Sequence, residues 1–537
     1  MPSKPTEPRT TQDAFTPLRS GLLKPNGIVR PVLLWGLTLL LWLPGIGNLP
    51  LRDWDEGLIA TVARSTVSQL NLSQPSLNWL LAWQWQGAYL NKPPGLHWLI
   101  GFASRLLGEQ EWTVRLVPCL IASLSVPLVL ELRRQLGGAD AERKALWSGL
   151  ILMTLLPMAR HGRLVMLDGS LVSSMLLLWT GWLSSRTRPW HGLLAGLGAS
   201  GVLMLKPPAL LGFVVITAAI IAIDRKHSQW SPKALAWAWV GILPGISWHL
   251  WHLSQRGQQA LVMWGGHGFA RVTGVVGDNT GSWVMPVTEV LKGGWPWLLL
   301  LPLGIRWAWS QRMQSAGRWE LGFLIGSAAL VLPLRTQLPW YSHLLWPAIA
   351  LLAAEGLEQV LTSGRPRWIS RIWSLLGSAL LITSVVLLLS GQGQALPRLA
   401  LLFAGIGLLG GGLQMLKPAA MQRHRGLITL LVGWALALLA LWQSPFWLWE
   451  LNESWDPRPL ASSIRQLPQD ALVILKGSTR PSLDWYARRE LHHNIDQPQH
   501  EHWVVNNSPL EGCQAIPAPK LLSDTDAAWK LWHCPAR

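Results

Sequence analysis

The chain has 537 residues, of which 50% are hydrophobic and only 14% charged, whereas soluble proteins carry about 25% charged residues. Its 45 Lys and Arg outnumber its 28 Asp and Glu, giving a net charge of +17, and these basic residues separate long apolar runs. The composition excludes an ordinary soluble enzyme. It also argues against a nucleic-acid-binding protein, which would gather its basic residues on soluble faces. A membrane protein whose cytoplasmic loops collect Lys and Arg accounts for both features.

Thirteen apolar runs approach the length of about 20 residues that a helix needs to cross the bilayer. The third and fifth runs are the shortest. We therefore expect an α-helical polytopic membrane protein with about 13 transmembrane helices and a small C-terminal soluble α/β domain. The runs cover residues 28–47, 113–132, 145–160, 166–185, 190–205, 207–223, 234–252, 295–310, 319–335, 339–358, 368–390, 396–416 and 424–448.

The distribution of Lys and Arg among the connecting segments predicts the orientation in the membrane. Basic residues are denser in the segments that would share a side with the N-terminus, although the loops of the other side are longer in total. This bias places the N-terminus in the cytoplasm and, with an odd number of spans, the C-terminus outside. Residues 1–448 would then form the membrane domain, with two long outer loops at 48–112 and 253–294. The first loop contains two helix-like stretches, 55–69 and 93–107, that can lie in the membrane interface.

The segment 449–537 loses the apolar character and is predicted to form a soluble domain outside the membrane. Strands are expected at 471–476 and 503–505, with a helix at 481–490 between them. Cys513 and Cys534 both lie in this segment, so a disulfide between them is allowed in an oxidising compartment. With only one further cysteine in the chain, a disulfide framework and a cysteine-based zinc site are excluded.

Polar residues beside the apolar runs are the most informative, because such groups are costly to place near a membrane. Nearly all of them map to the predicted outer side, and they come from six separate segments. A shared cavity is the interpretation that we prefer. They are Asp53, Asp55, Glu56, Lys92, His161, Arg163, Asp168, Lys206, His267, Arg271, Arg335, Tyr341 and His343.

Each of these groups also has an ordinary structural explanation. Asp55 and Glu56 after a span are what the positive end of a helix dipole favours. Lys92 before two prolines is compatible with a rigid helix start and a lysine that reaches toward lipid phosphate. The Pro-Pro pair after Lys206 is harder to explain this way, because irregular backbone between two apolar runs needs a cavity or a protein partner. His267 and His343 taken singly are more often simple polar groups than ligands.

Together, the polar residues suit one kind of chemistry. A carboxylate beside several cations can accept a proton while a phosphate departs, since Lys and Arg stabilise the charge that grows on the leaving group. Tyr341 can donate a further hydrogen bond. Because nucleotide donors are absent outside the cytoplasmic membrane, an activated group must arrive there on a lipid phosphate.

Five short motifs, in order along the chain, resemble the family of aminoarabinose lipid A transferases and protein O-mannosyltransferases. These are GT-C glycosyltransferases of the family 39 type, and the resemblance extends from the first span to about residue 360, with a soluble tail typical of the aminoarabinose branch. The motifs are Arg52-Asp-Trp-Asp-Glu-Gly57, Asn91-Lys-Pro-Pro-Gly-Leu-His-Trp98, Gly162-Arg-Leu-Val-Met-Leu-Asp168, Leu205-Lys-Pro-Pro208 and Leu338-Pro-Trp-Tyr-Ser-His343.

The resemblance implies an inverting transfer of a sugar from a polyprenyl-phosphate donor to an acceptor hydroxyl, on the periplasmic side of a bacterial inner membrane. The acceptor would be lipid A, a related glycolipid or a protein. The chain departs from the family at Gly57, Gly95 and His97, which bears on the identity of the sugar and the acceptor. The implied roles are Asp55 as general base with Glu56 as its catalytic neighbour; Lys92, Lys206, Tyr341 and Arg163 on the donor phosphate; and Asp168, His267, Arg271 and His343 in shaping the site.

Cofactor use and competing functions complete the expectations. Oxygen atoms of Asp53, Asp55 and Glu56 are suitable ligands for a divalent metal, but the cations already suffice for one phosphate, so we expect no metal requirement. A transporter or flippase of lipid-linked sugars is the main alternative of another class, although such proteins place their ionisable residues near the midplane. Labelling of cysteines introduced at positions 55, 92 and 206 from one or both sides of the membrane distinguishes the two.

Overall fold

The structure is a computed structural model of the whole chain. It describes residues 29–71, 73, 76–225, 231–265, 269–274, 282–448, 456–477, 479–493, 500–516 and 529–536. His267, which the sequence places in the site, lies outside the described residues.

The first half of the chain is almost entirely helical, and each of its apolar runs overlaps a helix. The two stretches of the first outer loop with helical spacing also form helices, α2 and α3. The elements are α1 (Val29–Trp42), α2 (Glu56–Ser68), η1 (Asn78–Leu80), β1 (Trp83–Gln84), β2 (Gly87–Ala88), α3 (Gly95–Leu107), α4 (Glu111–Ser123), α5 (Ser125–Leu136), α6 (Ala141–Thr154), α7 (Leu156–His161), α8 (Leu167–Ser184), η2 (Pro189–His191), α9 (Gly192–Leu203), α10 (Pro207–Ile223) and α11 (Pro232–Arg256).

The helical part continues to residue 447, and the remaining apolar runs overlap helices as well. Its elements are η3 (Gly257–Leu261), α12 (Ala270–Thr273), α13 (Val284–Gly293), η5 (Trp297–Leu300), α14 (Leu301–Ser310), α15 (Ser315–Val331), η6 (Pro339–Leu344), α16 (Trp346–Ser363), α17 (Arg367–Leu389), α18 (Ala395–Met415), α19 (Ala420–Trp442) and η7 (Pro445–Trp447).

Four helical segments of the described chain are individually long and apolar enough to cross a membrane. They are Glu111–Leu136, which joins α4 and α5, and then α17, α18 and α19; α1 and α10 are shorter apolar helices. The other apolar helices fall short in length or hydropathy when taken alone. A total of about 13 spans therefore stays a prediction.

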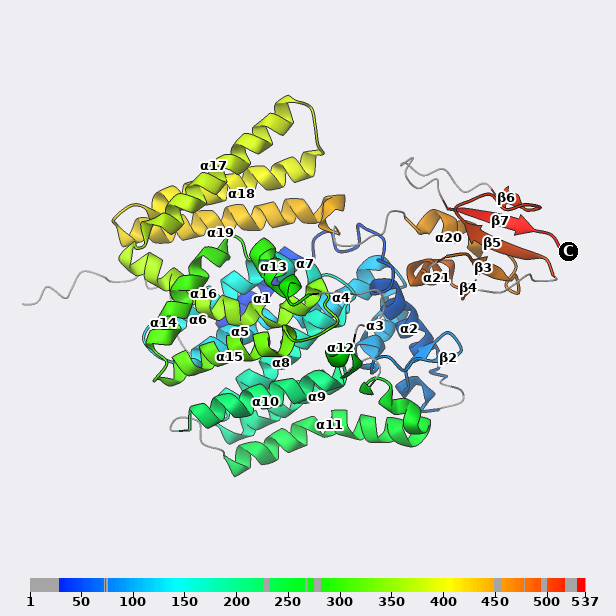
Figure 1. Cartoon of the computed structure of the whole chain (residues 1–537), viewed down its shortest axis with the longest axis horizontal. Helices are drawn as coiled ribbons and strands as arrows, with labels where there is room; N and C mark the ends of the chain where they lie inside the picture. Colours follow the sequence, from blue (N-terminus) through cyan, green and yellow to red (C-terminus); the bar gives the residue numbers. More distant parts are fainter. Residues whose placement is uncertain are drawn as a thin grey trace, which may run out of the picture.

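The helices form three groups around the site (Figure 1). Helices α17, α18 and α19 stack on one side and α9, α10 and α11 on the other, with α5, α6, α8, α15 and α16 between them. Glycines allow the close contacts. A Cβ on Gly407 of α18 would lie 2.9 Å from the Cα of Gly433 on α19, so the two backbones touch at this crossing. Small residues at crossings are the usual packing device of membrane helices.

Buried ion pairs fix the helix ends that are predicted to face the cytoplasm. The Arg133 guanidinium of α5 pairs with Glu355 of α16 and with Glu320 of α15, where the nitrogen–oxygen distance is 3.1 Å. Lys144 Nζ of α6 lies 2.7 Å from the second oxygen of Glu355. Such groups are stable at this depth only when they are paired. Part of the basic surplus of the sequence therefore holds helices together rather than binding a ligand.

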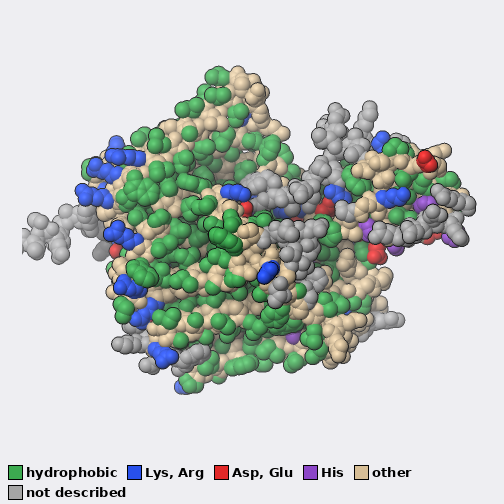
Figure 2. Space-filling model, in the orientation of Figure 1, with side chains coloured by type: hydrophobic (Ala, Val, Ile, Leu, Met, Phe, Trp, Pro, Cys, Tyr) green, Lys and Arg blue, Asp and Glu red, His purple; other side chains and the backbone are tan. Residues whose placement is uncertain are grey.

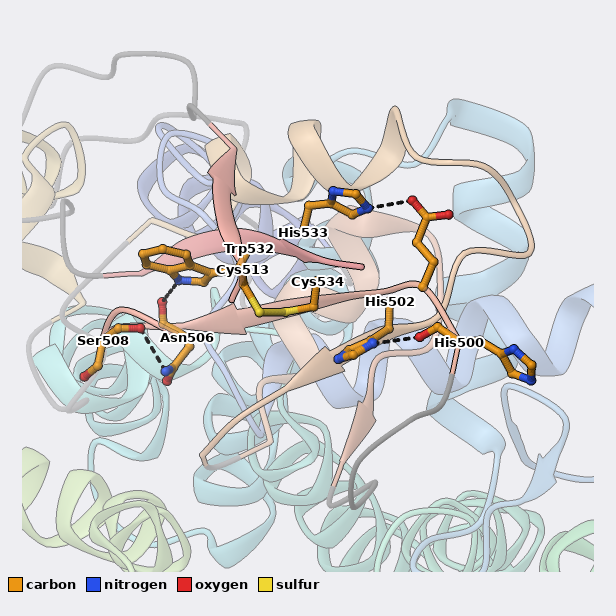
Figure 3. The surroundings of a disulfide bond; sticks show 9 residues. His500, His502, Asn506, Ser508, Cys513, Trp532, His533 and Cys534 are labelled. Carbon is orange, nitrogen blue, oxygen red and sulfur yellow. Dashed lines mark hydrogen bonds and ion pairs between the residues drawn. A yellow bond between two sulfur atoms is a disulfide. The ribbon is translucent and has the colours of Figure 1, made fainter. Parts of the chain in front are cut away.

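The C-terminal part forms a small α/β unit, as the sequence predicts. Its five-stranded sheet has the order β4-β3-β5-β7-β6, in which β3 is parallel to β4 and β5, and β7 is antiparallel to β5 and β6. Cys513 and Cys534 form a disulfide (Figure 3). The elements are α20 (Arg458–Arg465), β3 (Val473–Leu475), α21 (Pro481–Ala487), β4 (His492–His493), β5 (His502–Asn506), β6 (Gln514–Ile516) and β7 (Lys530–Cys534).

The surface of the helical part is predominantly apolar on the face that Figure 2 shows. Lys and Arg side chains gather on this face at the end opposite the C-terminal unit, whereas acidic and histidine side chains are more frequent on that unit. The two ends of the molecule therefore differ in charge as well as in secondary structure.

Candidate active site

A cavity of about 360 Å³ lies where the outer loops meet the ends of α8 and α10. Segments that are far apart in the sequence supply its polar groups, and leucines, methionines and other apolar side chains make up most of the remaining wall. The predicted convergence of separate segments on one space is thus present in the structure. The polar lining consists of Asp55, Lys92, Asp168, Lys206, Arg271 and Tyr341.

Prolines explain why two lysines face this space. Lys206 is the N-cap of α10, which begins with Pro207 and Pro208, and Lys92 directly precedes Pro93 and Pro94 at the start of α3. Proline is well suited to the first helical turn, where its missing N–H is not needed, and it prevents the helix from extending backward. Each lysine therefore lies directly before the first turn of a helix, because the prolines prevent the helix from including it.

Specific contacts organise the cations of the cavity. The Lys206 Nζ atom lies 2.6 Å from Asp168 Oδ1 and 5.6 Å from the centre of the Tyr341 ring. Arg271 Nη1 donates a hydrogen bond to the Tyr341 hydroxyl. These contacts orient Lys206 and Tyr341, which the resemblance assigns to the donor phosphate, and also Arg271, which it assigns to shaping the site. Asp168 emerges as the counter-ion of Lys206.

Asp55 reaches the cavity from the N-cap of α2. Within the described part of the chain, its carboxylate accepts no hydrogen bond and forms no ion pair, although Arg52 and Lys206 are near enough to influence it. Burial raises the pKa of Asp55 to about 6; the positive charge of Arg52 opposes this rise and the negative charge of Asp168 adds to it. The group is a carboxylate at neutral pH, yet it holds a proton far better than an exposed aspartate does. That is the character of a general base.

Lys92 also differs from an ordinary lysine. Burial lowers the pKa of its ammonium to about 7, and the nearby charges of Lys206 and Arg271 add to this effect. Among the described residues, no carboxylate forms an ion pair with it. An anion placed between these three cations would relieve their mutual repulsion.

Glu56 does not line the cavity, although it is the immediate neighbour of Asp55. Its fully buried carboxylate pairs with Arg115 through two hydrogen bonds of 2.8 and 2.6 Å, and it also accepts the backbone N–H groups of Arg52 and Val165. Burial alone would raise the pKa of Glu56, but Arg115 outweighs it and lowers the pKa. With its oxygens engaged in this way, Glu56 has the contacts of an anchor for the catalytic loop.

Arg163 and His343 are placed outside the cavity as well. The Arg163 guanidinium donates to the backbone oxygens of Trp42 and Pro44 and lies 4.5 Å from the ring centres of both Trp442 and Trp447. His343 is buried, with its ring nitrogens against the carbonyls of Trp340 and Pro157. Both side chains thus bind backbone carbonyls of neighbouring segments and do not line the cavity. The contacts of Arg163 do not fit the phosphate role that the resemblance implies.

Two glycines that depart from the family pattern have a steric explanation. A Cβ at Gly95 would lie 2.8 Å from Met204 Cβ and 2.9 Å from Met204 O, and a Cβ at Gly57 would lie 2.3 Å from Ser482 N. The third departure, His97, is fully buried against Tyr89 with a ring distance of 5.7 Å. In this chain the departures serve packing around the loop.

The sequence did not point to the C-terminal unit as a neighbour of the site. Asp53 accepts hydrogen bonds from the backbone and side chain of Ser482, and it pairs with Arg480 at 3.1 Å. Because these partners and those of Glu56 occupy the oxygens of two of the three acidic residues, the carboxylates are not arranged as a ligand set for a divalent metal. The sequence predicts a helix at 481–490, but no motif there links Arg480 or Ser482 to the first outer loop, so their contact with Asp53 was not foreseen.

The chain is similar in sequence to known glycosyltransferases. A family model described as dolichyl-phosphate-mannose-protein mannosyltransferase matches residues 91–252. The undecaprenyl phosphate-alpha-4-amino-4-deoxy-L-arabinose arabinosyl transferase 1 of Pseudomonas fluorescens is 27% identical over 67% of this chain, and the match spans only 63% of that relative. The corresponding transferase of Aeromonas salmonicida is 25% identical, over 88% of this chain and 90% of its own.

Solved structures decide the fold. ArnT from Cupriavidus metallidurans in the apo state superposes with a TM-score of 0.71 and 16% identity, over 94% of this chain and 97% of that one. The same protein bound to undecaprenyl phosphate gives a TM-score of 0.68 at 17% identity, over 95% and 98%. This chain has the GT-C fold. Its sequence is related to those of the aminoarabinose transferases.

The match to the family model covers only part of the GT-C site. Residues 91–252 include Lys92, Asp168 and Lys206 but exclude Asp55 and Tyr341. The two excluded residues enter the same cavity from the first loop and from η6. The cavity is therefore lined by residues from within the segment that the family model matches and by residues from outside it.

Proposed function

We propose that the chain is an inner-membrane glycosyltransferase that moves a sugar from a polyprenyl-phosphate donor to an acceptor hydroxyl on the periplasmic side. The acceptor in this proposal is lipid A or a related glycolipid. One observation carries it. The carboxylate of Asp55, which has no hydrogen-bond or ion-pair partner among the described residues, shares a cavity of about 360 Å³ with Lys92, Lys206, Arg271 and Tyr341, so that a base and a cluster suited to a phosphate face the same space.

Asp55 accepts the proton of the acceptor hydroxyl in the proposed reaction. The acceptor oxygen attacks the anomeric carbon of the donor sugar, and the bond from that carbon to the phosphate oxygen breaks with inversion. The electron pair leaves with the polyprenyl phosphate. Lys92, Lys206 and Arg271 stabilise the charge that forms on it, and Tyr341 supplies a hydrogen bond.

The long lipid of such a donor needs an apolar surface that reaches the cavity. A groove between α10 and α15 provides one, because Gly212 and Leu330 line both this groove and the cavity. Its floor contains Gly322 and Gly326, where side chains would collide with Ile220 and Ile216 of α10. We assign the polyprenyl chain to this groove and the phosphate to the cations at its end.

The periplasmic location is supported by two features at opposite ends of the molecule. The disulfide between Cys513 and Cys534 suits an oxidising compartment. The Lys and Arg that gather at the far end, in Figure 2, suit the cytoplasmic side. In this arrangement the C-terminal α/β unit is periplasmic and covers the catalytic loop.

An Asp55→Asn variant tests the catalytic assignment. Asparagine keeps the size of the side chain but cannot take the proton, so transfer from a defined polyprenyl-phosphate sugar is expected to fall by about 10²- to 10⁴-fold. Glu501→Gln, on the exposed surface of the C-terminal unit, is the matched control and keeps wild-type transfer. A correctly inserted Asp55→Asn protein with the wild-type rate would refute the assignment of the base.

The acceptor is identified by a separate experiment. Mass spectra of lipids and glycoproteins from cells with and without the gene reveal both the missing mass and the molecule that lost it. A lost sugar on a glycolipid supports the proposal. A lost sugar on proteins with unchanged lipids would replace the glycolipid acceptor by a protein acceptor.

A further inference from the structure

We propose that Arg480 and Ser482 of the C-terminal α/β unit are positioning residues that hold the catalytic base Asp55 in place. This inference rests on the proposed function of Asp55. In this inference the C-terminal unit does more than cover the membrane domain, because it also helps to position the base.

Asp53 is the point where the two parts of the chain are joined. Its carboxylate is buried, and both of its oxygens are used: Oδ1 accepts from the backbone N–H of Ser482 at 3.3 Å and from the Ser482 hydroxyl, and Oδ2 lies 3.1 Å from Arg480 Nε. These are charge-assisted contacts on a buried group, which are among the stronger hydrogen bonds of proteins. Asp53 stands only two residues before the base.

The turn between Asp53 and Asp55 has an unfavourable backbone conformation that needs support from its surroundings. Trp54 has a φ of 58°, which is unusual for a bulky residue, and the Asp55 N–H donates to the Asp53 carbonyl at 2.6 Å. Conformations of this kind persist when the surrounding structure holds them in place. Here the restraint comes from Arg480 and Ser482 acting through Asp53.

Further contacts keep the C-terminal unit seated beside the turn. The Tyr486 hydroxyl accepts the backbone N–H of Leu51 at 2.8 Å and donates to Glu111 at 3.0 Å. Gly57 makes the approach of α21 close, because any Cβ there would collide with the backbone of Ser482. The residues on both sides of Asp55 are thus in contact with one helix of the C-terminal unit.

Asp55 depends on these supports because it has none of its own among the described side chains. On its C-terminal side, the ion pair of Glu56 with Arg115 fixes the start of α2 to the membrane helices. On its N-terminal side, the Asp53 contacts are the side-chain contacts nearest to Asp55 that join the described part of this loop to the C-terminal unit, and the bond from Leu51 to Tyr486 lies two residues further back. Without them, Asp55 would retain its charge but lose its fixed position and part of its burial.

Arg480→Gln and Ser482→Ala in the full-length protein test the inference. We expect kcat to fall by about 10- to 100-fold, because a displaced base is a poor base. The KM for the polyprenyl-phosphate sugar should change less than twofold, because the cations of the donor site are on other elements. The acidic limb of the pH–rate profile should move from about 6 toward the value of 3.8 for a solvated aspartate.

Conservative variants and a control separate positioning from simple loss of structure. Arg480→Lys and Ser482→Thr retain the charge and the hydroxyl, and they should restore most of kcat. Arg489→Gln serves as the control, since the Arg489 side chain donates to backbone carbonyls within the C-terminal unit and not to the catalytic loop. Its pH profile should match the wild type.

The outcomes also distinguish this inference from the proposed function. If Asp55→Asn abolishes transfer while Arg480→Gln and Ser482→Ala keep the wild-type kcat and pH profile, the positioning role is overturned and the base assignment stands. A fall in kcat without any shift of the acidic limb would likewise overturn it. Wild-type transfer by Asp55→Asn would instead refute the function on which the inference rests.

Discussion

Lys92 is the cation of the cavity that an incoming phosphate affects most. Its ammonium has no carboxylate partner in the described chain, and burial together with Lys206 and Arg271 lowers its pKa to about 7. Lys206 differs because Asp168 already neutralises it at 2.6 Å. Two lysines that begin equivalent Lys-Pro-Pro motifs therefore have different surroundings, and the pKa of Lys92 lies near neutral pH.

The titration of Lys92 predicts a pH dependence of donor binding. As the pH rises through about 7, the ammonium becomes neutral and stops attracting the donor, whose phosphodiester keeps its single charge. The KM for the donor should therefore rise severalfold between pH 6 and pH 8.5. Lys92→Arg keeps its charge throughout this range and should give a flat profile. An equally steep rise in the Lys92→Arg variant would show that another group is responsible.

A substitution at Glu56 is expected to lower the stability of the protein, whereas a substitution at the neighbouring Asp55 is expected to lower its activity. Glu56→Gln leaves the buried Arg115 without its counter-charge, and breaking a buried pair in this way costs about 3–5 kcal/mol of unfolding free energy. Thermal unfolding of the detergent-solubilised protein measures the loss. Asp55→Asn, which breaks no ion pair with a described residue, is the comparison and should unfold at the wild-type temperature or slightly above it, because burial disfavours the charged form of Asp55. Similar losses for both variants would contradict the separation of their roles.

At the scale of elements, α3 brings Lys92 to the cavity by packing tightly against the end of α9. The contact of Gly95 with Met204 leaves no room for a methyl group, whose carbon would lie 2.8 Å from Met204 Cβ. Overpacking of this kind typically costs 1–3 kcal/mol or displaces the helix. The position of Lys92 therefore depends on the absence of a side chain at Gly95, three residues further along the chain.

Gly95→Ala is expected to lower both the stability and the affinity for the donor. The added methyl group pushes the start of α3 away from Met204, and Lys92 moves with it. Donor KM and thermal unfolding, measured together, check this expectation. Gly87→Ala in the same loop is the control, since its Cβ would meet only Gln84 O at an ordinary 3.5 Å. Unchanged KM in Gly95→Ala would mean that α3 does not set the position of Lys92.

The elements were largely predictable from the sequence, because apolar length, proline and helical spacing are local patterns. These patterns predicted the helices of the apolar runs and also α2 and α3. They also predicted that one cavity brings together Asp55, Lys92, Lys206 and Tyr341. The directions of individual side chains did not follow. Consecutive residues of a helix point about 100° apart, so Asp55 faces the cavity while Glu56 faces Arg115, a partner 59 residues away.

Arg163 and Asp53 were unpredictable for a related reason. Arg163 lies between Trp442 and Trp447, and Asp53 contacts Ser482, which is 429 residues distant in the chain. Nothing in the local sequence specifies such a partner, since any of many basic or aromatic residues would satisfy the same pattern. The resemblance assigned Arg163 to the donor phosphate from its place in a motif. A motif gives the order of residues along the chain, but it does not show whether a side chain faces the cavity or packs behind it.

At the scale of the whole molecule, the disulfide stabilises the unit that contacts the catalytic turn. Cys513 and Cys534 are 21 residues apart and connect the segment before β6 to the end of β7. Closing a loop of this length restricts the unfolded chain by about 3 kcal/mol. The sheet in turn carries α21, on which Ser482 is located.

Cys513→Ser together with Cys534→Ser should therefore destabilise the C-terminal unit by about 2–4 kcal/mol. Proteolysis of this unit in the membrane-bound protein measures the effect, and kcat should fall in parallel when the unit opens. Cys119→Ser is the control, because Cys119 is a free thiol in the membrane helices. Full resistance to proteolysis in the double variant would show that the sheet does not depend on the bridge.

The contact between Asp53 and Ser482 also has a consequence for biogenesis. Ribosomes synthesise Asp53 before the helices from α2 to α19 and Ser482 after them, so these helices are made before the two residues can meet. A nascent or prematurely terminated chain then holds Lys92 and Lys206 but lacks the contacts that Arg480 and Ser482 make with Asp53. If the proposed positioning role holds, newly inserted molecules reach full activity only after the segment with Ser482 has folded against the first loop.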